Sequence, residues 1–268
     1  MACNSASFII DGEPENNGVS MAKFDMGAAW DDSIALLKSH SALTGAIAAV
    51  FLFLPALALA WFGPVSVEPP EGATFDQIVT AFQENIWQIL PYQIGIAILA
   101  LVGSLAILRL WLSRAATSVG EALSFALRLL PTMIIIQILT GLITAFGFVL
   151  LVVPGLYLIG RLALTGPVVA DRSVANPLDA IAASWNLTRD NGWAIFLFIF
   201  LVTLVIGIVL LVVTGVIGAV VGSGPGIGHI IGGFFESAIG VGATMVSLAI
   251  SAAAYRQLAI GGNAEVFG

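Results

Sequence analysis

The sequence predicts an all-α, polytopic membrane protein with six transmembrane helices, arranged as three tandem units that each contain an interfacial helix and a transmembrane hairpin. Two observations carry this fold class. Hydrophobic residues make up 59% of the 268 residues and charged residues only 9%, whereas soluble domains contain roughly 25% charged residues. In addition, Lys and Arg concentrate in alternate gaps between long apolar runs, as the positive-inside rule requires of a polytopic membrane protein. The bilayer is therefore the expected solvent for most of the chain.

Composition divides the chain into four segments. Residues 1–20 are polar and partly acidic, which predicts a disordered tail. Residues 21–40 place apolar and aromatic residues at roughly helical spacing against acidic ones, which predicts an amphipathic interfacial helix. A six-span membrane domain at 41–258 and a C-terminal tail at 259–268 follow.

Six apolar runs are expected to span the membrane, because about 20 helical residues cross roughly 30 Å of hydrocarbon. The short fourth run begins at Pro154 and Gly155, which could form a hairpin turn or only kink one long helix. A single span here would place Arg172 and Arg189 on the same side as the cation-free gap at 63–88, so the cations favour two spans. Whether the fourth run crosses fully or is re-entrant stays open. The predicted spans are 41–62, 88–112, 129–152, 155–170, 193–221 and 230–255.

Charge also predicts location and partners. Six spans place every loop cation on one side, together with both termini, and this side is expected to be the cytoplasmic face of the membrane. A signal peptide is disfavoured for the first run, because that run follows an acidic segment of about forty residues rather than a short basic one. The net charge of −7 disfavours nucleic-acid binding. The expected partners are membrane lipids, with other membrane proteins as an open alternative.

A weak internal repeat precedes spans one, three and five. Each copy contains Ser, an apolar or aromatic residue, Leu and then a cation, at 33–38, 124–128 and 184–189. Repeated supersecondary units would place similar interfacial helices at 22–38, 117–128 and 177–189. The alternative is that any amphipathic stretch entering a membrane has this composition.

Few side chains could carry out chemistry. The chain has one Cys and two His, which cannot build a typical zinc site without several carboxylates. Ser223 lies in a glycine-rich stretch close to His229, but such a stretch is better explained as a tight turn. We therefore predict no catalytic, cofactor-binding or metal-binding residues, no cofactor and no enzymatic activity.

Two charges, Arg161 and Glu236, fall inside predicted spans. Each lies about six residues from the outer end of its span, hence roughly 9 Å deep, so they are candidates for a structural ion pair. The alternative is that each side chain reaches headgroups or water by snorkelling. Small residues recur at four-residue spacing nearby and predict close helix packing; these glycines are Gly207, Gly218, Gly228, Gly232 and Gly240. Tryptophans near span ends are predicted interfacial anchors, namely Trp61, Trp87, Trp111 and Trp193.

Three short motifs lie in the second half of the chain. They are Val153-Pro154-Gly155-Leu156-Tyr157, then Arg161-Leu162-x-Leu164 with Pro167, and Ala183-Ser184-Trp185-x-Leu187-Thr188 with Gly192-Trp193. In these motifs the chain resembles the membrane domain of glycerophosphodiester phosphodiesterases and the related YciC-like bacterial inner-membrane proteins. Catalysis in those phosphodiesterases belongs to a separate barrel domain, so the resemblance implies a membrane part without hydrolase activity.

The expected function is that of a non-enzymatic scaffold or accessory subunit in membrane protein or lipid organisation. The alternative is a small-solute or lipid transporter or channel with Arg161 and Glu236 near its path. A lipid-acting enzyme ranks third, because no nucleophile, base or metal set can be named.

Overall fold

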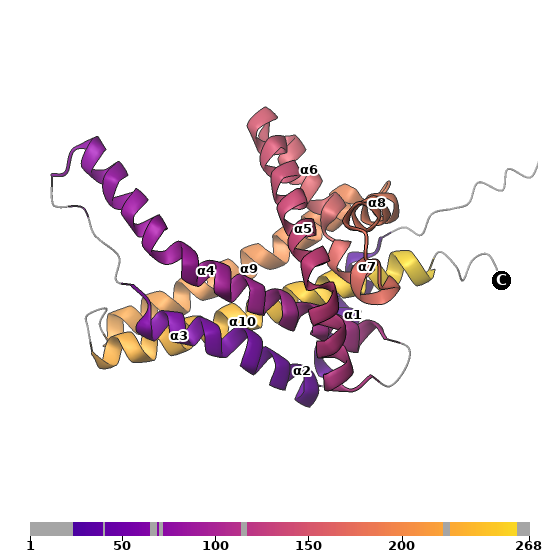
Figure 1. Ribbon diagram of the computed structural model, residues 1–268, viewed down its shortest axis with the longest axis horizontal. Helices are drawn as coiled ribbons and strands as arrows, with labels where there is room; N and C mark the ends of the chain where they lie inside the picture. The colour runs from indigo at the N-terminus through magenta and orange to yellow at the C-terminus, as the bar shows by residue number, and fades with distance from the viewer. Residues whose placement is uncertain are drawn as a thin grey trace, which may run out of the picture.

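The computed structural model describes residues 24–39, 41–64, 69, 72–113, 117–221 and 226–261. Every regular element in these ranges is helical (Figure 1), so the predicted all-α class is confirmed. The tail expected at 1–20 lies outside the described residues. The elements are α1 (Met26–Lys38), α2 (Ser41–Ala48), the π-helical turn η1 (Ala49–Phe53), α3 (Leu54–Phe62), α4 (Phe75–Leu112), α5 (Val119–Leu150), α6 (Val152–Leu162), α7 (Thr165–Arg172), α8 (Pro177–Leu187), α9 (Gly192–Val221), α10 (Ile227–Arg256) and η2 (Gln257–Gly261).

Six helical stretches are long and apolar enough to cross a membrane, which confirms the predicted number of spans. The second is longer than predicted, because α4 begins at Phe75 and runs for 38 residues, about 57 Å. A capping box between Thr74 and Gln77 starts this helix, since each side chain satisfies a backbone N–H that the first turn leaves free. The stretches are Ser41–Phe62, Phe75–Leu112, Val119–Leu150, Val152–Arg172, Gly192–Val220 and Ile227–Ala259.

Helices α5 and α6 form the hairpin that the cations favoured. The chain reverses at Leu151, whose backbone is extended, three residues before Pro154. Helix α5 starts at a capping box of Ser118 and Glu121 and continues to Leu150, so the interfacial helix predicted at 117–128 is not a separate element. Pro131 follows Arg128 by three residues but lies inside α5 and does not end the helix.

The fourth span is broken in the middle. Helix α6 ends at Leu162 and α7 starts at Thr165, with a turn at residues 163–164. Pro167 accounts for the break, because it has no N–H to donate to the carbonyl of Ala163 and its ring would clash with that carbonyl in a continuous helix.

The two described ends of the chain lie on the same side of the bundle, where α1 packs against the last turns of α10 (Figure 1). Asp32 and Arg256 form an ion pair of 3.0 Å, and the backbone N–H of Asp25 donates to Gln257 at 3.2 Å. Helix α1 is therefore docked along one face, on which Ala29, Ser33 and Leu36 are buried.

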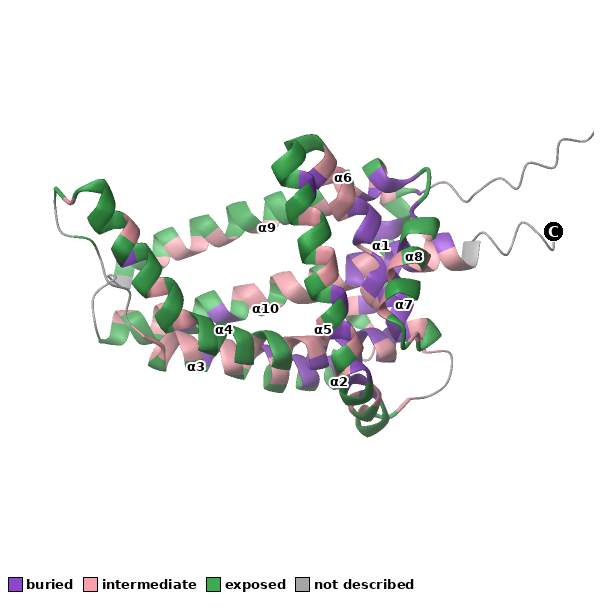
Figure 2. Cartoon of the chain, turned by 45° about the horizontal axis from the view of Figure 1, so that its top comes forward, coloured by how far each residue is buried: buried purple, intermediate pink, exposed green. Residues whose placement is uncertain are grey.

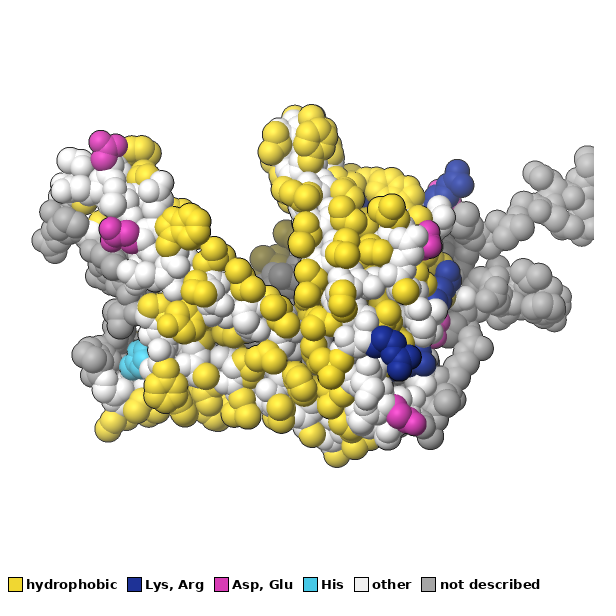
Figure 3. Space-filling model, in the orientation of Figure 1, with side chains coloured by type: hydrophobic (Ala, Val, Ile, Leu, Met, Phe, Trp, Pro, Cys, Tyr) yellow, Lys and Arg dark blue, Asp and Glu magenta, His cyan; other side chains and the backbone are white. Residues whose placement is uncertain are grey.

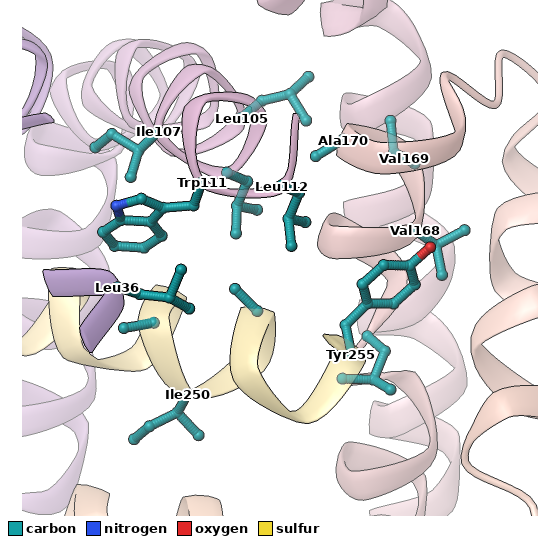
Figure 4. Packing of buried hydrophobic residues seen from close by; sticks show 14 of the residues in the cluster. Leu36, Leu105, Ile107, Trp111, Leu112, Val168, Val169, Ala170, Ile250 and Tyr255 are labelled. Carbon is teal, nitrogen blue, oxygen red and sulfur yellow. The ribbon is translucent and has the colours of Figure 1, made fainter. Parts of the chain in front are cut away.

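Burial concentrates where α1, α4, α7 and α10 meet, while α9 and the tip of the α5–α6 hairpin are largely exposed (Figure 2). Figure 4 shows Leu105, Val168, Ile250 and Tyr255 within this cluster. Trp111 also belongs to it and is only 7% exposed. Its prediction as an interfacial anchor was therefore wrong, because the helix face that carries it packs into the core.

Polar contacts tie the same helices together at this end. Arg109 of α4 donates to the carbonyl of Ala170 at 2.8 Å, close to the C-terminal end of α7. A cation at this end also stabilises the helix, because the C-terminal end of the helix dipole is negative. The Tyr255 hydroxyl donates to Asp171 at 2.6 Å and accepts from Arg172 at 3.2 Å. Lys and Arg side chains visible in Figure 3 gather at this end, whereas the visible His lies at the opposite end.

Candidate functional site

The most unusual side chain is that of Arg161, in the last turn of α6. Because the helix breaks at residues 163–164, the carbonyl of Arg161 has no partner one turn further on. Two hydroxyls of α8 replace that partner: Ser184 donates to this carbonyl at 2.9 Å and Thr188 at 3.1 Å. Both hydroxyls are buried, so α8 is fixed against the end of α6.

The guanidinium of Arg161 is held by aromatic rings. Its central carbon lies 4.2 Å from the ring centroid of Trp185 and 5.7 Å from that of Tyr157, within the range of cation–π attraction. The residue is only 3% exposed, and its Nε has no hydrogen-bond partner among the described residues. Arg161 is therefore largely enclosed by protein, and within the described chain it forms no ion pair.

A cavity of about 750 Å³ opens beside this guanidinium. Its polar wall includes Arg189 and Asp190, which follow α8, and its aromatic wall includes Tyr157 and Trp193, whose ring centroids are 5.5 Å apart. We call this the Arg161 pocket, lined by Val153, Pro154, Tyr157, Arg161, Trp185, Arg189, Asp190, Gly192 and Trp193. Trp193, predicted as an anchor, is 50% exposed at its rim.

Glycine makes the Arg161 pocket possible. A Cβ on Gly192 would lie 2.8 Å from Cδ of Arg161, so a larger residue would displace the side chain. A Cβ on Gly160 would overlap the Gly192 carbonyl and lie 2.9 Å from Cβ of Phe196. Helices α6 and α9 consequently approach closely at these two residues.

Arg161 and Glu236 do not form the predicted ion pair. The ion pair found among the described residues joins Asp32 and Arg256 instead. Glu236 is exposed and lines a different cavity of about 220 Å³ together with His229. The depth estimate failed because α6 begins at Val152 and ends at Leu162, so Arg161 lies at the α8 end of its helix rather than near the hairpin tip.

The predicted glycine stripe does not mark a tight interface. A Cβ on Gly207, Gly218, Gly232 or Gly240 would meet nothing within 4 Å, while Gly218, Gly228 and Gly232 line the small cavity beside Glu236. Close approaches occur instead at glycines that the four-residue spacing missed, namely Gly103, Gly147, Gly155, Gly160 and Gly233. Periodicity identified a helix face, but not the element that opposes it.

A third, central cavity of about 820 Å³ lies between α4, α5, α6, α7, α9 and α10. Figure 3 shows the surface hollowed between α4 and the α5–α6 hairpin, and both contribute to the lining. None of the lining residues carries a charge, and the polar ones are Ser104, Gln137, Thr140, Thr144, Thr165, Thr203, Thr244, Ser247 and Ser251. Neither Arg161 nor Glu236 reaches this cavity.

Within the described ranges, His, Cys, Asp and Glu form no group of three that could hold a metal ion. The motif residues of the predicted resemblance do converge: Tyr157, Arg161, Ser184, Trp185 and Thr188 all build the Arg161 pocket or fix its position. Tyr157 and Arg161 are four residues apart on one helix, and this spacing could have indicated their contact. The chain matches no protein-family model, no curated protein and no solved structure, so the family resemblance stays a prediction.

Proposed function

We propose that this chain is a non-enzymatic protein of the bacterial inner membrane, with cytoplasmic termini, that acts as a scaffold or accessory subunit in lipid organisation by holding a lipid acyl chain in its central cavity. The observation that carries this proposal is the uncharged lining of a cavity of about 820 Å³. This volume falls in the range of roughly 300 to 1,000 Å³ that is typical of ligand sites.

Four hydroxyls of the lining already donate to backbone carbonyls. Thr140 donates to the carbonyl of Ile136 at 2.8 Å, and Thr244 to that of Gly240 at 3.0 Å. Thr165 and Ser251 likewise donate to carbonyls of their own segments. Hydroxyls satisfied in this way need no polar ligand, so an acyl chain can fill the cavity without leaving those donors unpaired.

The exposed surface supports a role in lipid organisation. Only 11% of the most apolar stretch of α9 and 17% of that of α5 is buried. An apolar helix face can pack against lipid tails as favourably as against protein. Helices α5 and α9 can therefore contact the central cavity on one face and the surrounding lipid on the other. Transport with Arg161 and Glu236 along one path is less well supported, since these residues line two other cavities.

Lipid retention tests the proposal. Gly141 lines the central cavity and a Cβ there would meet nothing within 4 Å, so Gly141→Leu should place a larger apolar side chain in the space of the occupant. Gly95 is exposed, has equally open surroundings and lies outside the cavity, so Gly95→Leu is the matched control. Mass spectrometry of protein purified in mild detergent should find co-purifying lipid in the unmodified protein and the control, and less in Gly141→Leu.

Equal lipid retention in all three proteins would refute the proposed occupant. A stoichiometric membrane protein that crosslinks to the cavity in place of lipid would replace it with a protein partner. Uptake into vesicles of an uncharged solute, blocked by Gly141→Leu, would favour the transporter.

The orientation is tested separately by cysteine labelling. Cysteines introduced at Gly72 should be labelled from outside, and cysteines at Gly18 only from the cytoplasm.

A further inference from the structure

We propose that the Arg161 pocket binds the phosphate group of an anionic phospholipid. This inference goes beyond the proposed function, because the Arg161 pocket and the central cavity share no lining residue.

The first argument is the charge of Arg161. Arg161 is 3% exposed, forms no ion pair within the described chain, and its buried Nε has no hydrogen-bond partner there. A buried charge without a partner is costly in any protein, and in practice such charges pair with an ion of opposite sign. The aromatic contacts with Trp185 and Tyr157 attract the cation but do not neutralise it. An anion in the pocket would complete the site.

The second argument is the balance of charge around the cavity. Arg161 and Arg189 contribute two positive charges and Asp190 one negative charge, and no ion pair joins Asp190 to either arginine in the described structure. The pocket therefore carries an excess of one positive charge. Arginine is suited to phosphate because its planar guanidinium can donate two parallel hydrogen bonds to two phosphate oxygens. The contact with Trp185 is a cation–π contact, and the Nε of Arg161 has no hydrogen-bond partner within the described chain.

The third argument is the setting of the pocket, which identifies a lipid as the source of the phosphate. Trp185 is 39% exposed, Trp193 50% and Val153 59%, so the rim combines half-exposed indoles with an exposed apolar side chain. Tryptophans in this situation are typical of the level at which lipid headgroups lie. A lipid whose phosphate reaches Arg161 can lay its acyl chains over the exposed apolar residues of α6 and α9.

Lipid binding to the full-length protein in detergent tests this assignment. Phosphatidylglycerol and phosphatidylcholine with identical acyl chains are titrated separately, and bound lipid is counted by native mass spectrometry. Phosphatidylglycerol should bind more tightly, and Arg161→Gln should weaken its binding about tenfold or more, as expected on loss of charge-assisted hydrogen bonds. Arg189→Gln should weaken it less. Arg128 is an exposed cation outside the pocket, so Arg128→Gln is the matched control and should bind as the unmodified protein does.

Three results would overturn the proposal. Unchanged phosphatidylglycerol binding by Arg161→Gln would show that the guanidinium is not the site. Equal binding of both lipids would remove the preference for an anionic headgroup, and displacement of phosphatidylglycerol by equimolar inorganic phosphate would assign the site to a free anion. If Arg161→Gln does not fold, phosphatidylglycerol binding is measured with Arg161→Lys and Arg189→Gln instead. Unchanged binding by both variants would refute the assignment of the phosphate to the Arg161 pocket. Gly141→Leu alters the central cavity, which shares no lining residue with the Arg161 pocket, and should leave this binding intact, so the two proposals can fail separately.

Discussion

Substituting Gly160 by alanine should destabilise the protein, while the same substitution at Gly207 or Gly232 should stabilise it. At Gly160 the new Cβ would overlap the carbonyl oxygen of Gly192 and lie 2.9 Å from Cβ of Phe196. The first of these neighbours is backbone and cannot move without displacing α9. At Gly207 and Gly232 the new Cβ would meet nothing within 4 Å.

The expected magnitudes follow from two opposing effects. Overpacking costs about 1 to 3 kcal/mol, and a backbone neighbour places Gly160→Ala near the upper end. Alanine gains about 1 kcal/mol over glycine inside a helix, so the net loss should be about 2 kcal/mol. With about 2 to 4 °C per kcal/mol for a chain of this size, the unfolding midpoint should fall by about 4 to 8 °C. Gly207→Ala and Gly232→Ala should each raise the free energy of unfolding by up to about 1 kcal/mol, since only the higher helix propensity of alanine acts there.

Thermal unfolding in one detergent, followed by tryptophan fluorescence, measures all three variants against the unmodified protein. The decisive observation is the difference in sign between Gly160 and the two open glycines. A fall in the midpoint at Gly207 or Gly232 equal to that at Gly160 would mean that the predicted glycine stripe does form a tight interface. The assignment of close packing to Gly160 would then be wrong.

Three further experiments test separate parts of the structure. Thr188→Val should lower the free energy of unfolding by about 1 kcal/mol, because a buried α6 carbonyl loses one of its two hydroxyl donors; chemical denaturation measures it, and no change would mean that the hydroxyl is dispensable. Ile136→Ala should cost about 2 to 5 kcal/mol, because the side chain is fully buried, whereas the exposed Ile138→Ala should cost far less, and equal losses would contradict the packing. A double-mutant cycle of Asp32→Asn and Arg256→Gln should give a coupling below about 1 kcal/mol that weakens with salt, because both side chains are partly exposed; a larger, salt-independent coupling would contradict this.

The number of spans and the hairpin at Leu151 were predictable because they depend on properties that each segment carries by itself. Apolar length specifies a span, and the placement of Arg172 and Arg189 indicated that the chain reverses between the third and fourth runs. The boundaries were less predictable. Helix α4 starts 13 residues before residue 88, because the amphipathic stretch after Thr74 continues into the span without a break.

The Arg161 pocket could not be predicted from the sequence because it depends on contacts between segments. The predicted depth of Arg161 depends on a span that begins at Gly155, but helix α6 begins at Val152 and ends at Leu162. That end places Arg161 beside Trp185 of α8, 24 residues away in the chain. No periodicity within α6 specifies that neighbour. Tyr157, Arg161 and Trp185 lie in different helices of the chain or a turn apart, and the fold brings their side chains together.

The docking of α1 against α10 has a consequence for biogenesis. Asp25 and Gln257 are separated by 232 residues, so at about 5 to 20 residues per second the ribosome needs roughly 12 to 46 s to complete the partner of a helix that it made first. During that interval the face carrying Ala29, Ser33 and Leu36 has no α10 to cover it. We expect this face to bind the membrane surface instead, because an amphipathic helix buries its apolar side in the lipid interface. We therefore expect α1 to lie on the membrane surface until the last span is inserted, and only then to join the two ends of the bundle through Asp32–Arg256 and Asp25–Gln257.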